Sequence, residues 1–307
     1  MSKTRTGVYP DEKTIRLDNT ALNAFRRCPA EFGYRHGLNL VPTSDAESEH
    51  PPLALHYGIA WHSAMDVLYE TKNIDEAKEK FLEASDGLAD DPKNRKTRGR
   101  GVTDLEHYWS LYKAEIEALE LIANELIVST RIALPDDWTL EYVGAVDKVV
   151  RMPSGKIKIL DHKTLGYLTM YTPMQYELSN QLTGYGVIIR DFYGMEDDEV
   201  YVQADIVGPT RSKPPSEYLR PEILVDEVVA REWKEDITAT ANMIIGLHTN
   251  GGVYPRYGHD ACGRFGSLCT YFRLCSASPG MRERVEANLY TVLPWDPGER
   301  HEEGAAK

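Results

Sequence analysis

The chain has 307 residues, of which 42% are hydrophobic and 27% charged, a composition typical of a globular protein. No apolar run approaches the roughly 20 residues that cross a bilayer, and the first fourteen residues lack a secretory signal, so we expect a cytoplasmic protein without membrane contact. The net charge of −13 excludes a protein that coats nucleic acid over a broad surface, although a local basic track is compatible with it.

The first half of the chain is expected to be helical. A first helix follows Asn19 or Thr20, either of which can cap it, and a kink is expected at Cys28-Pro29. Further helices are predicted at about 54–71, 74–86 and 103–130, with a polar loop at 41–52 and a charged connector at 86–101. Basic residues gather in the segments 25–28, 93–101 and 210–213, which are either solvated loops or parts of a track for phosphates.

The pattern changes at Pro135. Two β-rich runs, 138–152 and 156–164, are joined by Pro153-Ser154-Gly155 and predict a hairpin. A helix is expected after Pro173, a strand over 198–208, a helix over about 222–249 and then a Cys-rich segment. We therefore predict an α/β protein in four parts, which are a helical region (1–134), an α/β core (135–210), a helix with a Cys-rich clamp (211–283) and a tail (284–307).

The hairpin carries the first sign of chemistry. Asp161 and Lys163 share the apolar face of one strand, because side chains alternate between the two faces. Asp147 has the apolar parity on the partner strand, so the two carboxylates can converge on one hard cation such as Mg²⁺ or Mn²⁺. The side chain of His162 points to the opposite face, which leaves its backbone carbonyl available as a further ligand.

These groups suit phosphodiester hydrolysis. A divalent ion lowers the pKa of a water and neutralises charge on the phosphate, and a neighbouring lysine can orient or deprotonate that water. The alternative is an ion pair between Asp161 and Lys163 on a solvated strand face, which a lone D-x-K pattern would favour. The preceding GAVD at hairpin spacing favours the catalytic interpretation.

GAVDKVV (144–150) followed by ILDHKT (159–164) resembles the core of PD-(D/E)XK nucleases of the RecB type. GIAWH (58–62) is similar to the helical histidine motif of that family, and this implies that His62 is a metal ligand. QLTGY (181–185) resembles the family's Q-x-x-x-Y motif, so Gln181 and Tyr185, one helical turn apart, would contact the substrate or the active site.

The resemblance covers residues 58–185 and implies a restriction-endonuclease-like core, in which helices flank a mixed sheet. It assigns the metal to His62, Asp147, Asp161 and the backbone carbonyl of His162, and the activation of water to Lys163.

The cysteines form a second pattern. Cys28 lies far upstream, and Cys262, Cys269 and Cys275 fall within fourteen residues near the carboxyl end. In a reducing compartment such a cluster is more often a metal site than a set of disulfides. AddB-type helicase–nuclease subunits and CRISPR-associated exonucleases, which the chain resembles here, carry one cysteine before the nuclease core and three after it, and this implies a 4Fe-4S cluster.

The spacing leaves alternatives open. Five residues separate Cys269 from Cys275, as in that pattern, but six separate Cys262 from Cys269 where two are usual. A Zn²⁺ site, in which His259 could replace one ligand, and four buried free thiols are the other interpretations. Either metal would close a long loop and clamp the fold.

The resemblance implies a metal-dependent deoxyribonuclease, an exonuclease on single-stranded or end-containing DNA that serves recombination, repair or phage DNA metabolism. The chain has no G-x-x-x-x-G-K-[ST] motif, so a helicase or recombination protein that acts with it would be a separate partner. The alternative is a non-catalytic DNA- or partner-binding module that keeps the nuclease fold, against which the intact Asp147, Asp161 and Lys163 speak. A zinc-stapled structural subunit would explain the cysteines but not the hairpin.

Overall fold

The computed structural model describes residues 7–46, 52–88, 95–195, 199–208, 215–264 and 267–295. The chain divides into two compact units. The first contains residues 1–49, 129–144 and 232–307, and the second contains residues 50–128 and 145–231. Each unit is therefore assembled from segments that are far apart in the sequence. None of the helices in the described ranges is long and apolar enough to cross a membrane.

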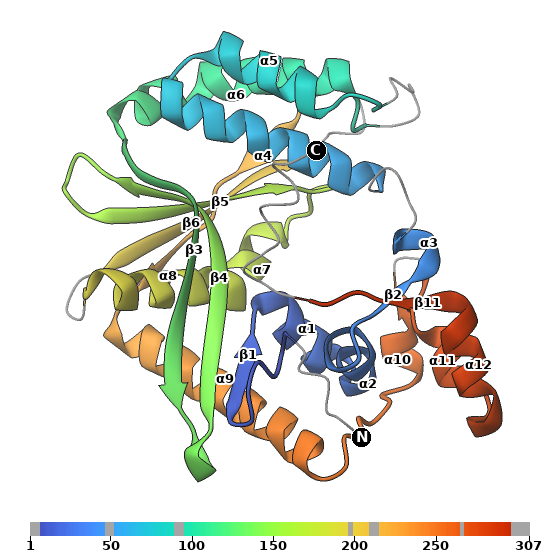
Figure 1. Ribbon diagram of the computed structural model, residues 1–307. Helices are drawn as coiled ribbons and strands as arrows, with labels where there is room; N and C mark the ends of the chain where they lie inside the picture. The colour runs from blue at the N-terminus through green and yellow to red at the C-terminus, as the bar shows by residue number, and fades with distance from the viewer. Residues whose placement is uncertain are drawn as a thin grey trace. The chain divides into compact units, whose positions relative to one another are not determined.

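The second unit is an α/β structure. Its helices are α4 (Leu53–Thr71), α5 (Ile74–Ala84), α6 (Arg98–Ala118), α7 (Thr172–Glu177) and α8 (Asn180–Tyr193). Its strands are β5 (Ile157–Thr164), β6 (Val200–Gly208), β7 (Glu217–Leu219) and β8 (Glu222–Val225), and β3 (Glu120–Ala133) and β4 (Thr139–Arg151) contribute residues to both units. Figure 1 shows α4, α5 and α6 on one side of β5 and β6, and α8 on the other side.

The first unit is built from short elements. They are β1 (Thr14–Leu17), α1 (Asn19–Arg27), α2 (Pro29–Phe32), the π-helix η1 (Gly33–Gly37), β2 (Leu40–Pro42), α3 (Thr43–Ala46), the 3₁₀ turn η2 (Pro135–Asp137), most of α9 (Glu227–Thr249), α10 (His259–Cys262), β9 (Gly263–Arg264), β10 (Ser267–Leu268), α11 (Phe272–Ser276), α12 (Pro279–Leu289) and β11 (Tyr290–Val292). Strand β11 pairs with β2, and β10 pairs with β9.

The main sheet is mixed. Among the described residues it has seven strands in the order β1-β4-β5-β6-β7, with β3 beside β4 and β8 beside β6. Strands β1 and β4 are parallel, as are β5 and β6, whereas β4 and β5 are antiparallel, and both β7 and β8 run antiparallel to β6. The predicted α/β fold, with a mixed sheet flanked by helices, is confirmed.

The predicted β4–β5 hairpin is also present. Its turn needs a glycine, because Gly155 has φ of +85° and donates its N–H to the carbonyl of Met152 at 2.8 Å. The backbone N–H of Met152 donates to the carbonyl of Lys156 at 2.9 Å. This turn fixes the register that pairs Lys148 with Leu160 and Arg151 with Ile157.

Helix α4 is held by one continuous apolar stripe. Its buried residues are spaced three and four apart, as a helix face requires, and are Tyr57, Ala60, Trp61, Ala64, Met65, Leu68 and Tyr69. They pack with residues of α5 and α6 and with Leu160 and Val207 of the sheet. His62 and Asp66 lie beside this stripe, one turn apart, and so face the edge of the core.

Two predicted helices are wrong in part. The helix expected over 103–130 ends at Ala118, and residues 120–133 form β3, because this stretch is rich in β-branched residues that favour a strand. The helix expected from about 222 begins at Glu227, since Glu222–Val225 pairs with β6 as β8. Asp226 separates the two elements, and its Oδ1 accepts the N–H of Val229 at 2.9 Å as a helix cap.

The expected break at Cys28-Pro29 is confirmed, because Cys28 is extended and Pro29 is the first residue of α2. The expected cap of the first helix is wrong by one residue. Asp18, rather than Asn19 or Thr20, accepts the N–H of Ala21 at 2.6 Å.

Gly101 of α6 tests the tightness of the helical layer. A Cβ at this position would lie 2.0 Å from the ring of the buried Phe81. Gly101→Ala should therefore lower the free energy of unfolding by about 1–3 kcal/mol through overpacking, although alanine favours a helix. Gly246→Ala, in α9 with nothing within 4 Å of its Cβ, is the control and should raise it by up to about 1 kcal/mol. Urea unfolding of both variants that gave equal stabilities would contradict this account of the α5–α6 contact.

Candidate active site

The two carboxylates of the hairpin lie on adjacent strands. Continuing the β4–β5 register by one residue sets Asp147 opposite Asp161. Asp161 is fully buried, and the Nζ of Lys163 lies 2.9 Å from its Oδ1 and 2.8 Å from its Oδ2. The Oδ2 of Asp147 accepts the backbone N–H of His162 at 2.7 Å, so a hydrogen bond ties the first carboxylate to the strand that carries the second.

Helix α4 brings a fourth group to this place. The Nδ1 of His62 lies 3.3 Å from the Oδ2 of Asp147, and the charge of His62 acts on Asp161. The structure thus brings together His62, Asp147, Asp161 and Lys163, the residues that the sequence predicts for the site. Their roles remain predictions.

Charge is crowded around Asp161. The pKa of Asp161 is raised to about 6, chiefly by burial. Lys163 and His62 lower this pKa, and Asp147 raises it. Burial alone would lower the pKa of Lys163, but Asp161 and Asp147 outweigh burial and raise it. Lys163 is therefore the charged counter-ion of a carboxylate that is costly to ionise.

The donor types fit a hard divalent cation. Mg²⁺ and Mn²⁺ accept carboxylate, imidazole and backbone carbonyl ligands. The site offers two mutually repelling carboxylates, one imidazole and one carbonyl. Within the described ranges, however, no three His, Cys, Asp or Glu side chains are spaced to share one metal ion.

The side chain of His162 lies in the buried layer between Tyr69, Asp147 and Asp205. Its ring is fully buried beside Tyr69, with Nδ1 3.9 Å from Asp147 Oδ2 and Nε2 4.0 Å from Asp205 Oδ2. Burial, with the charge of Lys148 next in effect, holds the pKa of His162 well below its usual range. The ring is therefore neutral, and only the backbone carbonyl of this residue remains a candidate ligand.

A buried polar network on this face of β5 was missed by the sequence reasoning. Lys148, which is 1% exposed at its side chain, lies 2.5 Å from Asp66 of α4. Asp205 of β6 accepts a hydrogen bond from Tyr108 at 2.5 Å and lies 3.3 Å from Arg220. The signal that could have revealed it is the presence of Lys148 and Asp205 inside otherwise apolar strands.

Tyr176 of α7 is a second residue that the sequence reasoning missed. Burial raises the pKa of its hydroxyl, and the charges of Lys163 and Asp161 act on this pKa in opposite directions, so Tyr176 lies within electrostatic range of that pair. No spacing pattern in the sequence marks it.

Gln181 and Tyr185 lie on one face of α8, which packs on β5 and β6. The Nε2 of Gln181 donates a hydrogen bond to the hydroxyl of Tyr185 at 2.8 Å. The two side chains therefore lie next to each other on one helix, and their contact with a substrate remains a prediction.

Most of the described basic residues in the segment 93–101 are engaged within the protein. Lys96 donates to the carbonyl oxygen of Thr164 at 3.0 Å and to its hydroxyl at 3.1 Å. Arg98 donates to the carbonyl of Leu82 at 2.7 Å, and Arg100 donates to the hydroxyl of Ser216 at 3.2 Å. These three side chains thus anchor the start of α6. Residues 93, 94 and 210–213 lie outside the described residues.

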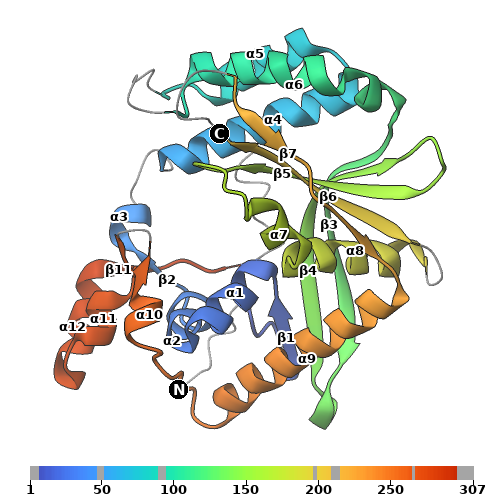
Figure 2. The same ribbon diagram turned by 180° about the vertical axis from the view of Figure 1, so that it is seen from behind.

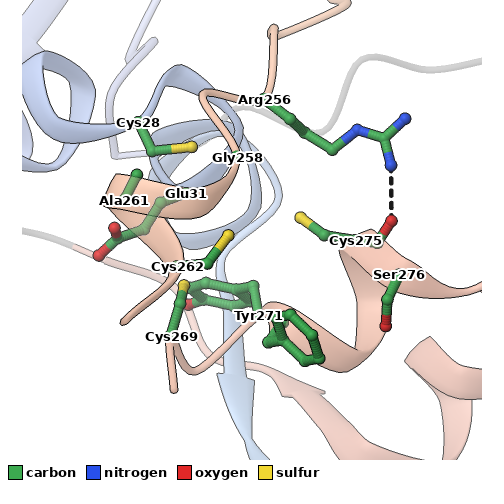
Figure 3. Close-up of a pocket in the computed structure, with 11 residues that line it drawn as sticks. Cys28, Glu31, Arg256, Gly258, Ala261, Cys262, Cys269, Tyr271, Cys275 and Ser276 are labelled. Carbon is green, nitrogen blue, oxygen red and sulfur yellow. Dashed lines mark hydrogen bonds between the residues drawn. The ribbon is translucent and has the colours of Figure 1, made fainter. Parts of the chain in front are cut away.

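The first unit brings its four cysteines to one cavity of about 280 Å³. Cys28 comes from the α1–α2 junction, and Cys262 is the last residue of α10. Cys269 directly follows β10, and Cys275 lies in α11. Figure 3 shows the four sulfur atoms turned toward the space between them. All four are free thiols, and burial raises the pKa of Cys269 and Cys275.

This donor set fits a metal that prefers thiolates, since four sulfurs enclose one space. The sulfurs are not at ligand spacing in the described part of the chain. The side chain of His259 lies outside the described residues. Iron–sulfur and zinc occupants therefore both remain predictions.

Several solved structures resemble this chain at low similarity. A candidate exonuclease from Eubacterium rectale has 13% identity and a TM-score of 0.48, and the match covers 86% of this chain and 94% of that one. LHK-Exo, solved with dAMP, has 13% identity and a TM-score of 0.27, and the match covers 64% of this chain and 94% of that one. SSO0001 has 15% identity and a TM-score of 0.25, and the match covers 61% of this chain and 74% of that one. Because these TM-scores are below 0.5, the likenesses add nothing to a functional argument.

A family model gives the decisive comparison. No curated protein matches the chain, but the model of the PD-(D/E)XK nuclease superfamily matches residues 17–276. The matched region includes the hairpin, α4, α8 and the four cysteines. A match over most of the sequence shows that the chain belongs to the PD-(D/E)XK nuclease superfamily.

Proposed function

We propose that the protein is a metal-dependent deoxyribonuclease, and specifically an exonuclease on single-stranded or end-containing DNA. Membership of the superfamily implies a nucleic-acid substrate and suggests phosphodiester hydrolysis. The observation that carries the proposal is the meeting of His62 from α4 with Asp147, Asp161 and Lys163 of the hairpin. The sequence motifs support three finer parts of the proposal. These are DNA as the substrate, exonuclease action, and a role in recombination, repair or phage DNA metabolism beside a separate helicase or recombination protein.

His62, Asp147, Asp161 and the carbonyl of His162 would hold Mg²⁺ or Mn²⁺. Such an ion supplies positive charge to the phosphate and lowers the pKa of a water molecule. The protein's own part is to hold the carboxylates ionised and in place, through the hydrogen bond from His162 to Asp147 and the ion pair of Asp161 with Lys163.

Lys163 would position the attacking water. Its raised pKa keeps the ammonium charged as long as Asp161 carries its own charge, so Lys163 donates hydrogen bonds to a water or a phosphate oxygen. Lys163 could accept a proton only after the charge of Asp161 was neutralised, because Asp161 is the main cause of the raised pKa. Gln181 and Tyr185 would contact the substrate from α8.

Removing Lys163 separates catalysis from folding. Lys163→Ala should fold, because Asp161 can take up a proton once its counter-ion is gone, and it should lose about 10²–10⁴-fold in cleavage. Lys156→Ala is the control, since this exposed lysine at the hairpin turn pairs with Glu199. The measurement is cleavage of end-labelled single-stranded DNA with Mn²⁺, beside circular dichroism. Normal cleavage by Lys163→Ala would overturn the catalytic proposal, and an inactive but DNA-binding parent would indicate a non-catalytic module.

Metal binding should depend on pH through Asp161. The carboxyl must lose its proton to bind a cation, so the rise in Tm caused by Mn²⁺ should be full above pH 6 and should shrink as the pH falls through about 6. Asp161→Asn should abolish this rise, whereas Asp75→Asn, at an exposed carboxylate of α5, should preserve it. Chelation with EDTA should stop cleavage. Full activity in EDTA, or equal Mn²⁺ stabilisation of Asp161→Asn, would contradict the metal site.

The cysteine cavity would hold a 4Fe-4S cluster, with Zn²⁺ as the alternative, and would clamp the first unit. Cys28→Ser and Cys275→Ser should each lose the metal, melt earlier and become sensitive to protease, while Ser276→Ala, at a neighbouring lining residue, should behave as the parent. The visible spectrum of anaerobically purified protein distinguishes a coloured cluster from colourless zinc. If the parent protein contained no metal and Cys28→Ser had the same Tm, the proposed metal clamp would be wrong, but the proposed nuclease function would be unaffected.

A further inference from the structure

An exposed apolar segment lies next to the candidate active site. It covers residues 165–178, between the end of β5 and the start of α8, and is called the aromatic segment below. Five of its large side chains are 59–88% exposed, and these are Tyr167, Met170, Tyr171, Met174 and Leu178. An exposed group of this kind in a water-soluble chain usually marks a binding surface.

The aromatic segment has an ordered backbone. Leu165 donates its N–H to the carbonyl of Val207 at 2.9 Å, and Leu168 packs so closely on Gly208 that a Cβ there would lie 2.3 Å from it. Thr172 is buried, and its hydroxyl accepts the N–H of Thr169 at 2.9 Å. The exposed rings are therefore presented by a fixed turn, which lowers the entropy cost of binding.

Both ends of the turn return to the site. Tyr167 follows Lys163 by four residues, a span of at most about 14 Å along the chain. Tyr176, near the other end, lies within electrostatic range of Lys163 and Asp161. Figure 2 shows the chain leaving β5 and turning into α7 before α8 begins. A strand whose phosphate reached Asp161 and Lys163 would lay its neighbouring nucleotides over this surface.

The chemistry of the segment suits bases rather than phosphates. Residues 165–178 contain a single charged residue, Glu177, and the whole chain has a net charge of −13. Lys96, Arg98 and Arg100 are engaged within the protein. We therefore expect contacts without charge to contribute to the affinity for a strand. Exposed tyrosine rings stack on bases of any sequence, and methionine sulfur makes favourable contacts with aromatic rings.

We propose that Tyr167 and Tyr171, with Met170 and Met174 around them, stack on the unpaired bases of a single strand of DNA and so select it over a duplex. In a duplex the bases are paired and stacked on each other, and their faces are not available. The proposal rests on the proposed nuclease function, because the phosphate at Asp161 and Lys163 sets the direction of the strand.

The test compares two oligodeoxynucleotides of equal length, one with bases and one in which every nucleotide is abasic. Binding of the full-length protein is measured by fluorescence anisotropy in Ca²⁺. A Tyr167→Ala/Tyr171→Ala variant should lose roughly 5- to 100-fold in affinity per stacked base for the base-bearing strand, with little change for the abasic strand or for duplex. Tyr167→Phe/Tyr171→Phe keeps the rings and should bind as the parent does.

The matched control removes two other exposed rings. Phe192→Ala/Tyr193→Ala alters a ring pair at the far end of α8, about 18 Å along the helix from Gln181, and should leave all affinities unchanged. Equal binding by the parent and Tyr167→Ala/Tyr171→Ala would overturn the stacking surface, as would equal losses on the base-bearing and abasic strands, or a parent that binds no DNA. A parent that cleaves while the alanine variant binds normally defeats this inference alone. A parent that fails to cleave but shows the base-dependent loss defeats the nuclease alone.

Discussion

The ion pair of Asp161 with Lys163 is the interaction around which the second unit is arranged. A carboxylate with no exposed surface is costly to ionise, and here Asp147 on the adjacent strand adds repulsion. A short apolar strand paired on both sides holds the two groups, because β5 lies between β4 and β6. Stability alone gives no reason for such crowding. A site that binds a cation and a phosphate would give a reason for this crowding, because carboxylates with perturbed pKa values are frequent at functional sites.

On the opposite face of β5, the buried charges lie in ion pairs. Lys148 is matched by Asp66, and Asp205 by Arg220 and Tyr108, while the ring of His162 between them stays neutral. These pairs join the sheet to α4 and α6, and α4 also carries His62. The ion pair of Asp66 with Lys148 thus helps to fix α4 on the sheet, and with it the position of His62 against Asp147. The contrast between this face and that of Asp161 points to the latter as the place for an added cation.

The hairpin and the residues gathered at it could be predicted from the sequence, because a two-residue period, a turn glycine and short motifs are local signals. The strands β3 and β8 could not. Residues 120–133 continue the apolar content of the helix before them, and the pairing of Glu222–Val225 with β6 depends on a partner distant in the sequence. The sequence pattern also gives no sign that Lys96 and Arg100 are engaged, because their partners, Thr164 and Ser216, are distant in the sequence. The position of Tyr176 relative to Lys163 follows from a turn whose path only the tertiary contacts define.

The order in which the segments leave the ribosome has a consequence for synthesis. The second unit is complete once residue 231 has emerged, whereas the first requires the pairing of Leu40 with Val292. At ~5–20 residues per second, the intervening stretch takes roughly 3–12 s to appear. During that interval Cys28 and the early helices α1 and α2 lack the strands and thiols that later enclose them. The nascent chain should therefore present a folded second unit while its amino-terminal segment still lacks α11 and β11.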